Sequence, residues 1–287
     1  MIELSADLNN EQRYKTSFKY DSYGKILHQN RNKISSPYLE AELRSYLPLT
    51  FDSHGWQRGI IPQISYKLEN NLFYSGDKYI QYDQLRFILQ GYVMRPVAKA
   101  AVYPRYGAGI IARSSLSPSG FNFYSPLASI KAYFYLPGLF STHGIKVTAE
   151  YQRQFTEGRT YYIKNLINMP PGYDNDITAD HLSNIGVSYA LPLYLNDIDL
   201  GFFAYLQRVQ LIPFADYGRY KKRRVENSGN ITGNLYSFGS DFLVDGHFFR
   251  IGAPMSIGFR YARLKYDPLY KNSKNHFALL FNISLTK

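Results

Sequence analysis

The 287-residue chain contains no cysteine, a single tryptophan and no apolar run near the length of a membrane-spanning helix. Without cysteine it can form neither a disulfide scaffold nor a thiolate metal site or nucleophile. A transmembrane helix needs about 20 consecutive apolar residues, so a helical membrane protein is excluded. Apolar residues also do not recur at spacings of three and four over ten or more positions, and we therefore expect almost no helix.

Tyrosine and phenylalanine are abundant instead, with 28 and 19 copies, while the mean hydropathy is −0.32. Such an average is usual for a soluble protein, but it also fits a β-barrel in lipid, in which only every second residue is apolar. Basic residues outnumber acidic ones by 33 to 22, which gives a net charge of +11. This excess indicates an acidic partner, either nucleic acid or the phosphates of lipopolysaccharide.

The segment from His276 to Lys287 alternates between two kinds of side chain. Successive residues of a strand point to opposite faces, so one face is an unbroken apolar stripe and the other is smaller and mostly polar. The apolar stripe consists of Phe277, Leu279, Phe281, Ile283 and Leu285. One face suits lipid and the other a wet interior, which is typical of an outer-membrane β-barrel.

The same pattern recurs in further segments, many of them longer than ten residues. Globular strands average about five or six residues, whereas a tilted strand needs about 9–11 to cross a bilayer. The predicted strands are 2–8, 12–23, 36–49, 58–73, 84–96, 101–115, 127–137, 143–156, 182–195, 205–219, 234–245, 249–265 and 275–286. We predict an all-β fold, an antiparallel transmembrane β-barrel of about 12–16 strands that forms one domain over residues 1–287.

The start of the chain carries no secretory signal, because a strand-like run follows Met1 directly. A barrel of the bacterial outer membrane must be exported. We therefore expect that residues upstream of Met1 are missing.

Patterns that carry catalysis or bind metal are not found. The six histidines are scattered, without the spacing of a metal site, and there is no nucleophile elbow, Walker loop or glycine fingerprint. We expect no metal, no cofactor and no enzymatic activity. A phospholipase that brings a serine and a histidine together from distant strands stays open as an alternative.

A basic run lies in a predicted outer loop and consists of Lys221, Lys222, Arg223 and Arg224. It is either a contact for lipopolysaccharide phosphates or a solvated loop tip. No helix or aromatic stacking sheet accompanies the run, so nucleic-acid binding is disfavoured.

Two further motifs lie in the C-terminal half. The long loop 157–181 contains Pro170, Pro171, Gly172 and Tyr173. The second strand after it contains Phe214, Asp216 and Gly218. Together with the last five strands, these motifs resemble the C-terminal half of the outer-membrane insertase superfamily, the barrels of the BamA type.

This resemblance implies a loop whose tip folds into the lumen and is received by an inner-wall strand. Pro171 stands where the family has an arginine, so the family's ion pair between loop and strand cannot form. Asp216 would instead accept hydrogen bonds from Tyr173 or from a basic residue such as Arg208 or Arg260. The alternative is that residues 216–218 merely end a strand with turn-favouring residues.

A closer resemblance covers most of the chain. Residues 102–107 (VYPRYG), 135–139 (YLPGL), 143–144 (HG) and 150–152 (EYQ) resemble, in order and spacing, segments of the branch in which a β-propeller precedes the barrel. This resemblance implies that the chain is the C-terminal part of a longer protein. About three strands and any periplasmic domain would then be absent.

The resemblance implies insertion or translocation of outer-membrane components without covalent chemistry. The first and last strands would meet weakly, so that the seam opens and its free edge templates an incoming strand. Client outer-membrane proteins and periplasmic or lipoprotein partners would bind there. Two alternatives stay open: a porin-like channel for small solutes lined by Lys146, Glu150 and Arg260, or a passive anchor for a periplasmic domain. Each places the protein in the lipid bilayer of the bacterial outer membrane.

Overall fold

The computed structural model describes residues 2–9, 13–20, 26–34, 38–75, 78–98, 100–119, 125–156, 165–173, 179–223, 230–249, 253–265 and 274–283. Over these residues the protein is all-β, with fifteen strands and no helix, which confirms the predicted all-β class with almost no helix. Correspondingly, this part of the chain contains no helix of the length and apolarity needed to span a membrane.

Thirteen strands form one antiparallel sheet. In sheet order they are β1 (Ile2–Asn9), β4 (Tyr38–Tyr46), β6 (Trp56–Ser75), β7 (Lys78–Met94), β8 (Gly107–Leu116), β9 (Leu127–Pro137), β10 (Gly144–Gln154), β11 (His181–Asp199), β12 (Ala204–Arg223), β13 (Asn230–Phe248), β14 (Met255–Leu264) and β15 (Asn275–Ile283), with β5 (Leu49–Ser53) paired to β6. A separate pair is formed by β2 (Arg13–Tyr20) and β3 (Ile26–Ile34). From β6 onward each strand pairs with its neighbours in sequence, so this part of the sheet is a meander.

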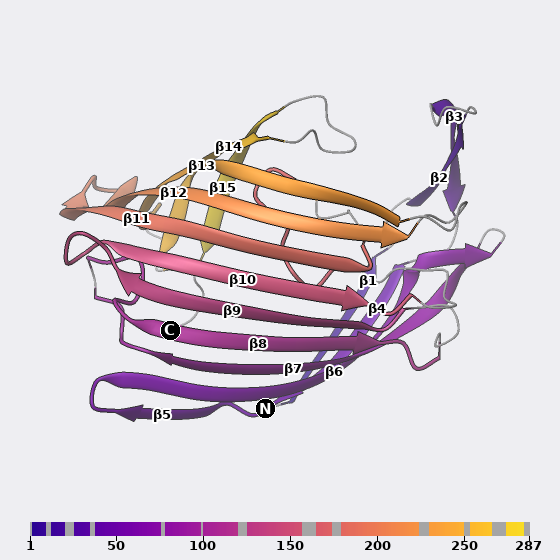
Figure 1. Ribbon diagram of the computed structural model, residues 1–287, viewed down its shortest axis with the longest axis horizontal. Coiled ribbons are helices and arrows are strands. Elements are labelled where there is room, and N and C mark those ends of the chain that lie inside the picture. Colours follow the sequence, from indigo (N-terminus) through magenta and orange to yellow (C-terminus); the bar gives the residue numbers. More distant parts are fainter. Residues whose placement is uncertain are drawn as a thin grey trace.

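The large sheet is strongly curved (Figure 1). Strands β6 to β12 face the viewer, while β1 and β4 at one end and β14 and β15 at the other turn to the far side. Long antiparallel strands twist and coil in this way because each strand has a right-handed twist. The sheet therefore has a concave inner face and a convex outer face. Its two ends are β1 and β15, and the described residues contain no pairing between them.

The strand register places side chains of one kind on one face. Val147 in β10 lies opposite Phe134 in β9 and Val187 in β11, whereas Glu150 lies opposite Lys131. Directly opposed residues of neighbouring strands share a face. The apolar residues therefore form rows across the sheet on one side, and the charged and amide residues form rows on the other.

The outer face is apolar and exposed, and the inner face is polar and buried. Leu279 is 91% exposed, whereas Gln152 and Ser237 are completely buried. The exposed outer-face residues include Leu43, Ile60, Ile64, Phe87, Leu89, Ile110, Ile130, Phe134, Ile185, Val187, Leu193, Leu211, Phe238, Ile257, Phe259, Phe277 and Phe281. This distribution is the reverse of a soluble domain, in which apolar side chains fill the interior.

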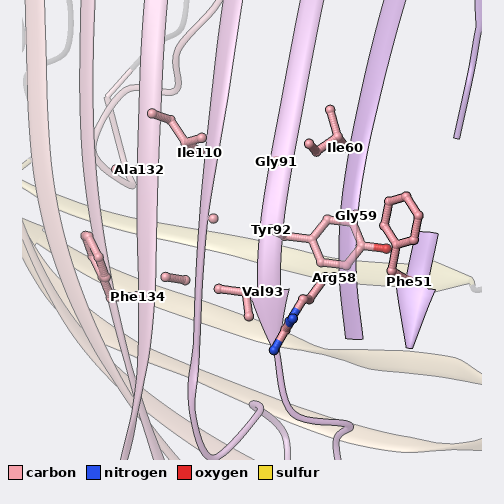
Figure 2. A pocket seen from close by; sticks show the side chains of 12 residues that line it. Phe51, Arg58, Gly59, Ile60, Gly91, Tyr92, Val93, Ile110, Ala132 and Phe134 are labelled. Atoms are coloured by element: carbon pink, nitrogen blue, oxygen red, sulfur yellow. The ribbon is translucent and has the colours of Figure 1, made fainter. Parts of the chain in front are cut away.

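An apolar groove of about 550 Å³ crosses the outer face from β5 to β9 (Figure 2). Small residues leave this space, namely Gly91, Ala108 and Ala132. Behind the groove, on the inner face of the sheet, the ring of Tyr92 lies against Gly59, where an added Cβ atom would overlap the ring. The larger side chains around the groove are Phe51, Ile60, Val93, Ile110 and Phe134, together with one charged side chain, Arg58. The outer face is thus apolar even where it is hollowed.

The predicted strands fit best in the middle of the chain. The structure has β9 at the predicted 127–137 and β10 within the predicted 143–156. The predicted strand 101–115 begins only at Gly107, because residues 100–106 fold onto the inner face. β3 was not predicted.

The predicted strand 36–49 is divided into β4 and the start of β5. Proline has no backbone N–H to continue a ladder, and Pro48 lies at the break. The short hairpin from β5 to β6 turns at His54 and Gly55, whose φ angles are 51° and 73°. Positive φ at both central residues matches the twist of a two-residue hairpin. This hairpin lacks the Asn-Gly or Asp-Gly pair that usually marks such a turn in sequence.

Candidate functional site

Two connecting segments lie on the inner face of the sheet. Residues 100–106 precede β8, and residues 165–173 belong to the connection between β10 and β11. Both segments meet polar side chains that the strands direct inward. These contacts define the candidate site.

The first half of segment 165–173 is held by β8 and β10. The backbone N–H of Leu166 donates to Gln152 Oε1 at 2.7 Å, and Arg113 Nη1 donates to the carbonyl oxygen of Leu166 at 2.9 Å. The N–H of Asn168 donates to Glu150 Oε2 at 3.1 Å. Hydrogen bonds from both strands therefore fix the segment across the sheet.

The tip of the segment lies against β12 and β13. Pro170 packs on Gly218, where an added Cβ would lie 3.1 Å from the proline ring. The carbonyl oxygen of Pro171 accepts a hydrogen bond from Ser237 Oγ at 2.5 Å. Gly172 has a φ of 94°, a conformation that glycine adopts without steric cost. The structure thus brings Pro170 to the strand that carries Gly218, whereas Gly172 lies against Ala262 and Leu264 of β14 and His276 of β15.

Tyr173 completes the attachment. It is buried, and its hydroxyl donates to the carbonyl oxygen of Tyr236 at 3.3 Å and accepts from the Tyr236 N–H at 3.2 Å. Around it lies a small apolar cluster inside the curved sheet, made of Ile167, Met169, Tyr173, Ala179, Leu182, Tyr220, Leu235 and Leu264. The segment's Ile167, Met169 and Tyr173 thereby pack against the apolar side chains that the strands direct inward at this place, Leu182, Tyr220, Leu235 and Leu264.

A charged cluster lies beside this tip. Arg260 Nε and Nη2 donate to the two carboxylate oxygens of Asp241 at 2.6 and 2.7 Å, a bidentate pair. The guanidinium carbon lies 5.4 Å from the centre of the Phe214 ring. Asp216 and Pro171 share with this pair a cavity of about 210 Å³. Five of the residues singled out from sequence therefore line one cavity, namely Lys146, Pro171, Phe214, Asp216 and Arg260.

Asp216 does not meet two of its expected partners. Tyr173 is hydrogen-bonded to the backbone as described, and Arg208 Nε donates to Asp245 at 2.8 Å. The hydrogen bond that Asp216 accepts comes from Asn184. Arg260 is near enough to act on Asp216 electrostatically while its hydrogen bonds go to Asp241.

Segment 100–106 covers a second part of the inner face. Arg208 donates to the carbonyl oxygen of Ala101, and the Tyr103 hydroxyl lies 3.1 Å from Ser188 Oγ. The Tyr103 ring centre is 5.6 Å from that of Tyr135. Burial raises the pKa of the Tyr103 hydroxyl above its usual range, so the hydroxyl stays neutral and able to donate.

The basic run does not lie in a loop, contrary to the prediction. Lys221, Lys222 and Arg223 are the last residues of β12, whose pairing with β13 continues to Arg223. Arg224 lies outside the described residues. Because neighbouring strand residues point to opposite faces, Lys221 is on the outer face and Lys222 on the inner face. The run therefore does not form one patch.

The predicted seam strand is β15. Phe277, Leu279 and Phe281 are all exposed on its outer face. Ile283 is its last residue, and Leu285 lies outside the described residues. In the sheet order β15 has β14 as its neighbour and ends the sheet.

Sequence reasoning missed Arg113, which holds segment 165–173, and the two carboxylates Asp241 and Asp245, which pair with Arg260 and Arg208. Each is a charged residue at an inward position of a strand, which is the only signal that the sequence carries. That signal does not say which loop or strand the residue will meet. Within the described residues, no three His, Asp or Glu side chains gather in a way that could hold a metal ion.

Comparison with known proteins adds no assignment, since no family model and no curated protein sequence matches the chain.

The ion pair of Arg260 and Asp241 yields a stability prediction. We expect Arg260→Met to lower the free energy of unfolding by roughly 2–3 kcal/mol, since it leaves the mostly buried Asp241 carboxylate without its partner. Urea titration of the protein in detergent micelles or bilayers measures the change. The double variant Arg260→Met with Asp241→Asn should recover much of the loss, because no unpaired charge remains. Equal stabilities for both variants would contradict this assignment.

Proposed function

We propose that the protein is a β-barrel of the bacterial outer membrane that acts in the insertion or translocation of outer-membrane components without covalent chemistry. The observation that carries the membrane assignment is the reversed polarity of the two faces. A soluble monomer rarely exposes a continuous apolar surface of more than a few hundred Å². Here the apolar surface extends along the middle of the outer face across the strands of the meander, and hydrocarbon is the solvent that suits it.

Strand length supports the same proposal. β6 and β12 have 20 residues each, and β11 and β13 have 19. About 9–11 residues suffice to cross a bilayer at the usual tilt. The remaining residues would extend beyond the membrane, where polar side chains and connections find water.

Closure follows from the same physics. A free strand edge has no water to hydrogen-bond with in the bilayer core, so a spanning sheet must close into a barrel. The curvature already turns both ends of the sheet to one side (Figure 1). We propose that the seam lies between β1 and β15, with β15 as one lip.

The filled inner face favours insertion over solute transport. Segments 100–106 and 165–173 lie across the space through which a solute would pass, and each is fixed by hydrogen bonds to several strands. A strand at an openable seam offers unpaired N–H and C=O groups to which an incoming strand can add. Client outer-membrane proteins are the partners that this mode requires, and periplasmic or lipoprotein partners would deliver them.

A porin-like channel is the second candidate, favoured by the charged cavity. Lys146, Asp216, Asp241 and Arg260 line it, and a neighbouring cavity of about 410 Å³ extends from Arg260 to Asn282. Mixed charges around water-filled space are what a small polar solute would meet.

The face assignment predicts unequal effects of arginine on β15. Leu279→Arg should destabilise the protein by roughly 2–4 kcal/mol near the bilayer midplane, because the charge faces hydrocarbon. Asn282→Arg, on the inner face, should be tolerated. Unfolding titrations in lipid vesicles measure both variants. If the two cost the same, the outer face is not in lipid.

Single-channel recording separates the two candidate functions. The filled interior predicts silence or brief flickers in a planar bilayer, and replacing residues 165–173 by an equally long Gly/Ser linker should give a larger, steadier conductance. The same replacement in the turn at 139–142 is the control and should leave the recording unchanged. A steady open channel in the unaltered protein would support the porin instead.

Locking the seam tests insertion directly. Proteoliposomes with the protein should speed the folding of a urea-denatured β-barrel client relative to empty liposomes. Since the chain has no cysteine, cysteine pairs can be scanned between β1 and β15 for one that forms a disulfide. The locked protein should fall to the rate of empty liposomes, and reductant should restore it.

The control for this experiment is a disulfide between positions Ser256 and Asn282, which lie opposite each other in the paired strands β14 and β15. It should leave the acceleration intact. A seam-locked protein with full activity, or an unmodified protein no faster than empty liposomes, would rule out seam opening as the mechanism.

A further inference from the structure

A row of basic side chains crosses three strands on the outer face. Arg153 near the end of β10 lies opposite His181, the first residue of β11, and His181 lies opposite Lys221 near the end of β12. The alternation of each strand puts all three on the face that carries the exposed Tyr151 and Ile185. We call these three residues the basic row.

The basic row carries an electrostatic cost. Arg153 and Lys221 flank His181 from the two neighbouring strands and repel a positive charge on it, and Arg219 adds a further exposed charge two residues before Lys221 on the same face. The structure records no ion pair between Arg153 or Lys221 and any other described residue. The neighbouring acid is Asp180, which is buried and accepts a hydrogen bond from Thr156 at 2.7 Å. An anion over the row would offset the remaining positive charge.

A pocket of about 150 Å³ lies at the row, which is room for roughly five water volumes. Besides the row, Gln154, Phe155, Thr156, Asp180 and Asn230 line it. The Asp180 carboxylate accepts the hydrogen bond of the Thr156 hydroxyl, which leaves amide, imidazole and cationic groups as the donors at this place. The Tyr151 hydroxyl lies 3.0 Å from His181 Nδ1 and holds the imidazole in position. This donor set is suited to the several oxygens of a phosphate group.

The surface next to the row is apolar. Tyr151, Ile185 and Tyr217 are exposed 44%, 56% and 45% on the same face, two or four residues away from the row along their strands. Phe155, 40% exposed, stacks under Arg153 with its ring centre 4.8 Å from the guanidinium carbon. A free phosphate ion would use the row but leave these side chains uncovered. A lipid with a phosphorylated headgroup would cover both.

We propose that the basic row binds the phosphate of an anionic membrane lipid, of the lipid A type, whose acyl chains lie along Ile185 and Tyr217. The proposal rests on the membrane barrel proposed above. It replaces the lipopolysaccharide contact predicted for the linear run of residues 221–224 with a site built across three strands. Lys221 is the only residue that the two have in common.

Native mass spectrometry of the whole chain in detergent micelles tests the site, with bisphosphorylated lipid A and dephosphorylated lipid A as probes. The folded protein should retain the phosphorylated lipid preferentially. Arg153→Gln and Lys221→Gln should each lower that retention roughly fivefold, the factor for losing one exposed charge contact. Arg153→Lys should keep most of it.

Arg263→Gln is the matched control, because Arg263 is an exposed base on the outer face of β14, away from the row. It should leave retention unchanged. Equal retention of both lipids, equal loss in Arg263→Gln and Arg153→Gln, or equally tight binding of inorganic phosphate would each overturn the lipid site. Protein that stays monodisperse in buffer without detergent would overturn the membrane barrel as well, whereas equal retention by micelle-bound protein overturns the lipid site alone.

Discussion

The structure depends on one constraint, which is that the polar face of the sheet is turned inward and the apolar face outward. A strand offers its side chains to two faces in strict alternation, so choosing the environment of one face decides that of the other. With the curvature seen here, the inner face holds amides and charges that must find partners away from bulk water. The rest of the architecture answers that requirement.

The polar side chains of the inner face find their hydrogen-bond and ion-pair partners in two ways. Some are supplied by neighbouring strands, as in the opposed pair of Lys131 and Glu150, joined at 2.6 Å. Others join the strands to the connecting segments. Asp245 receives Arg208 and Ser256, and Arg208 also reaches the backbone of segment 100–106. Polar networks of this kind are rigid when they are fully satisfied. They hold the two segments in place and leave small charged cavities between them.

The outer face has a different organisation along its strands. Its middle is apolar, including the groove over β5 to β9, and the basic row stands where β10 and β12 end. In the proposed membrane setting, this arrangement matches the layers of a bilayer, with hydrocarbon in the middle and phosphates at the boundary. The proposed seam and the proposed lipid site are on different strands, so a protein could engage lipid at one while a client pairs at the other.

The sequence by itself determined the all-β class, the two-faced strands and which side chains share a face, because these follow from a period of two that is local to each strand. Leu279 belongs to the apolar stripe that the alternation predicts and is exposed on the outer face, whereas Asn282, three residues later, lines a cavity on the inner face. Only the tertiary structure decided which polar residues meet. Arg260 pairs with Asp241, and Asp216 with Asn184, through register and loop placement that bring distant segments together. Likewise, Arg153, His181 and Lys221 are 28 and 40 residues apart in sequence and become neighbours only through strand pairing, which no local pattern encodes.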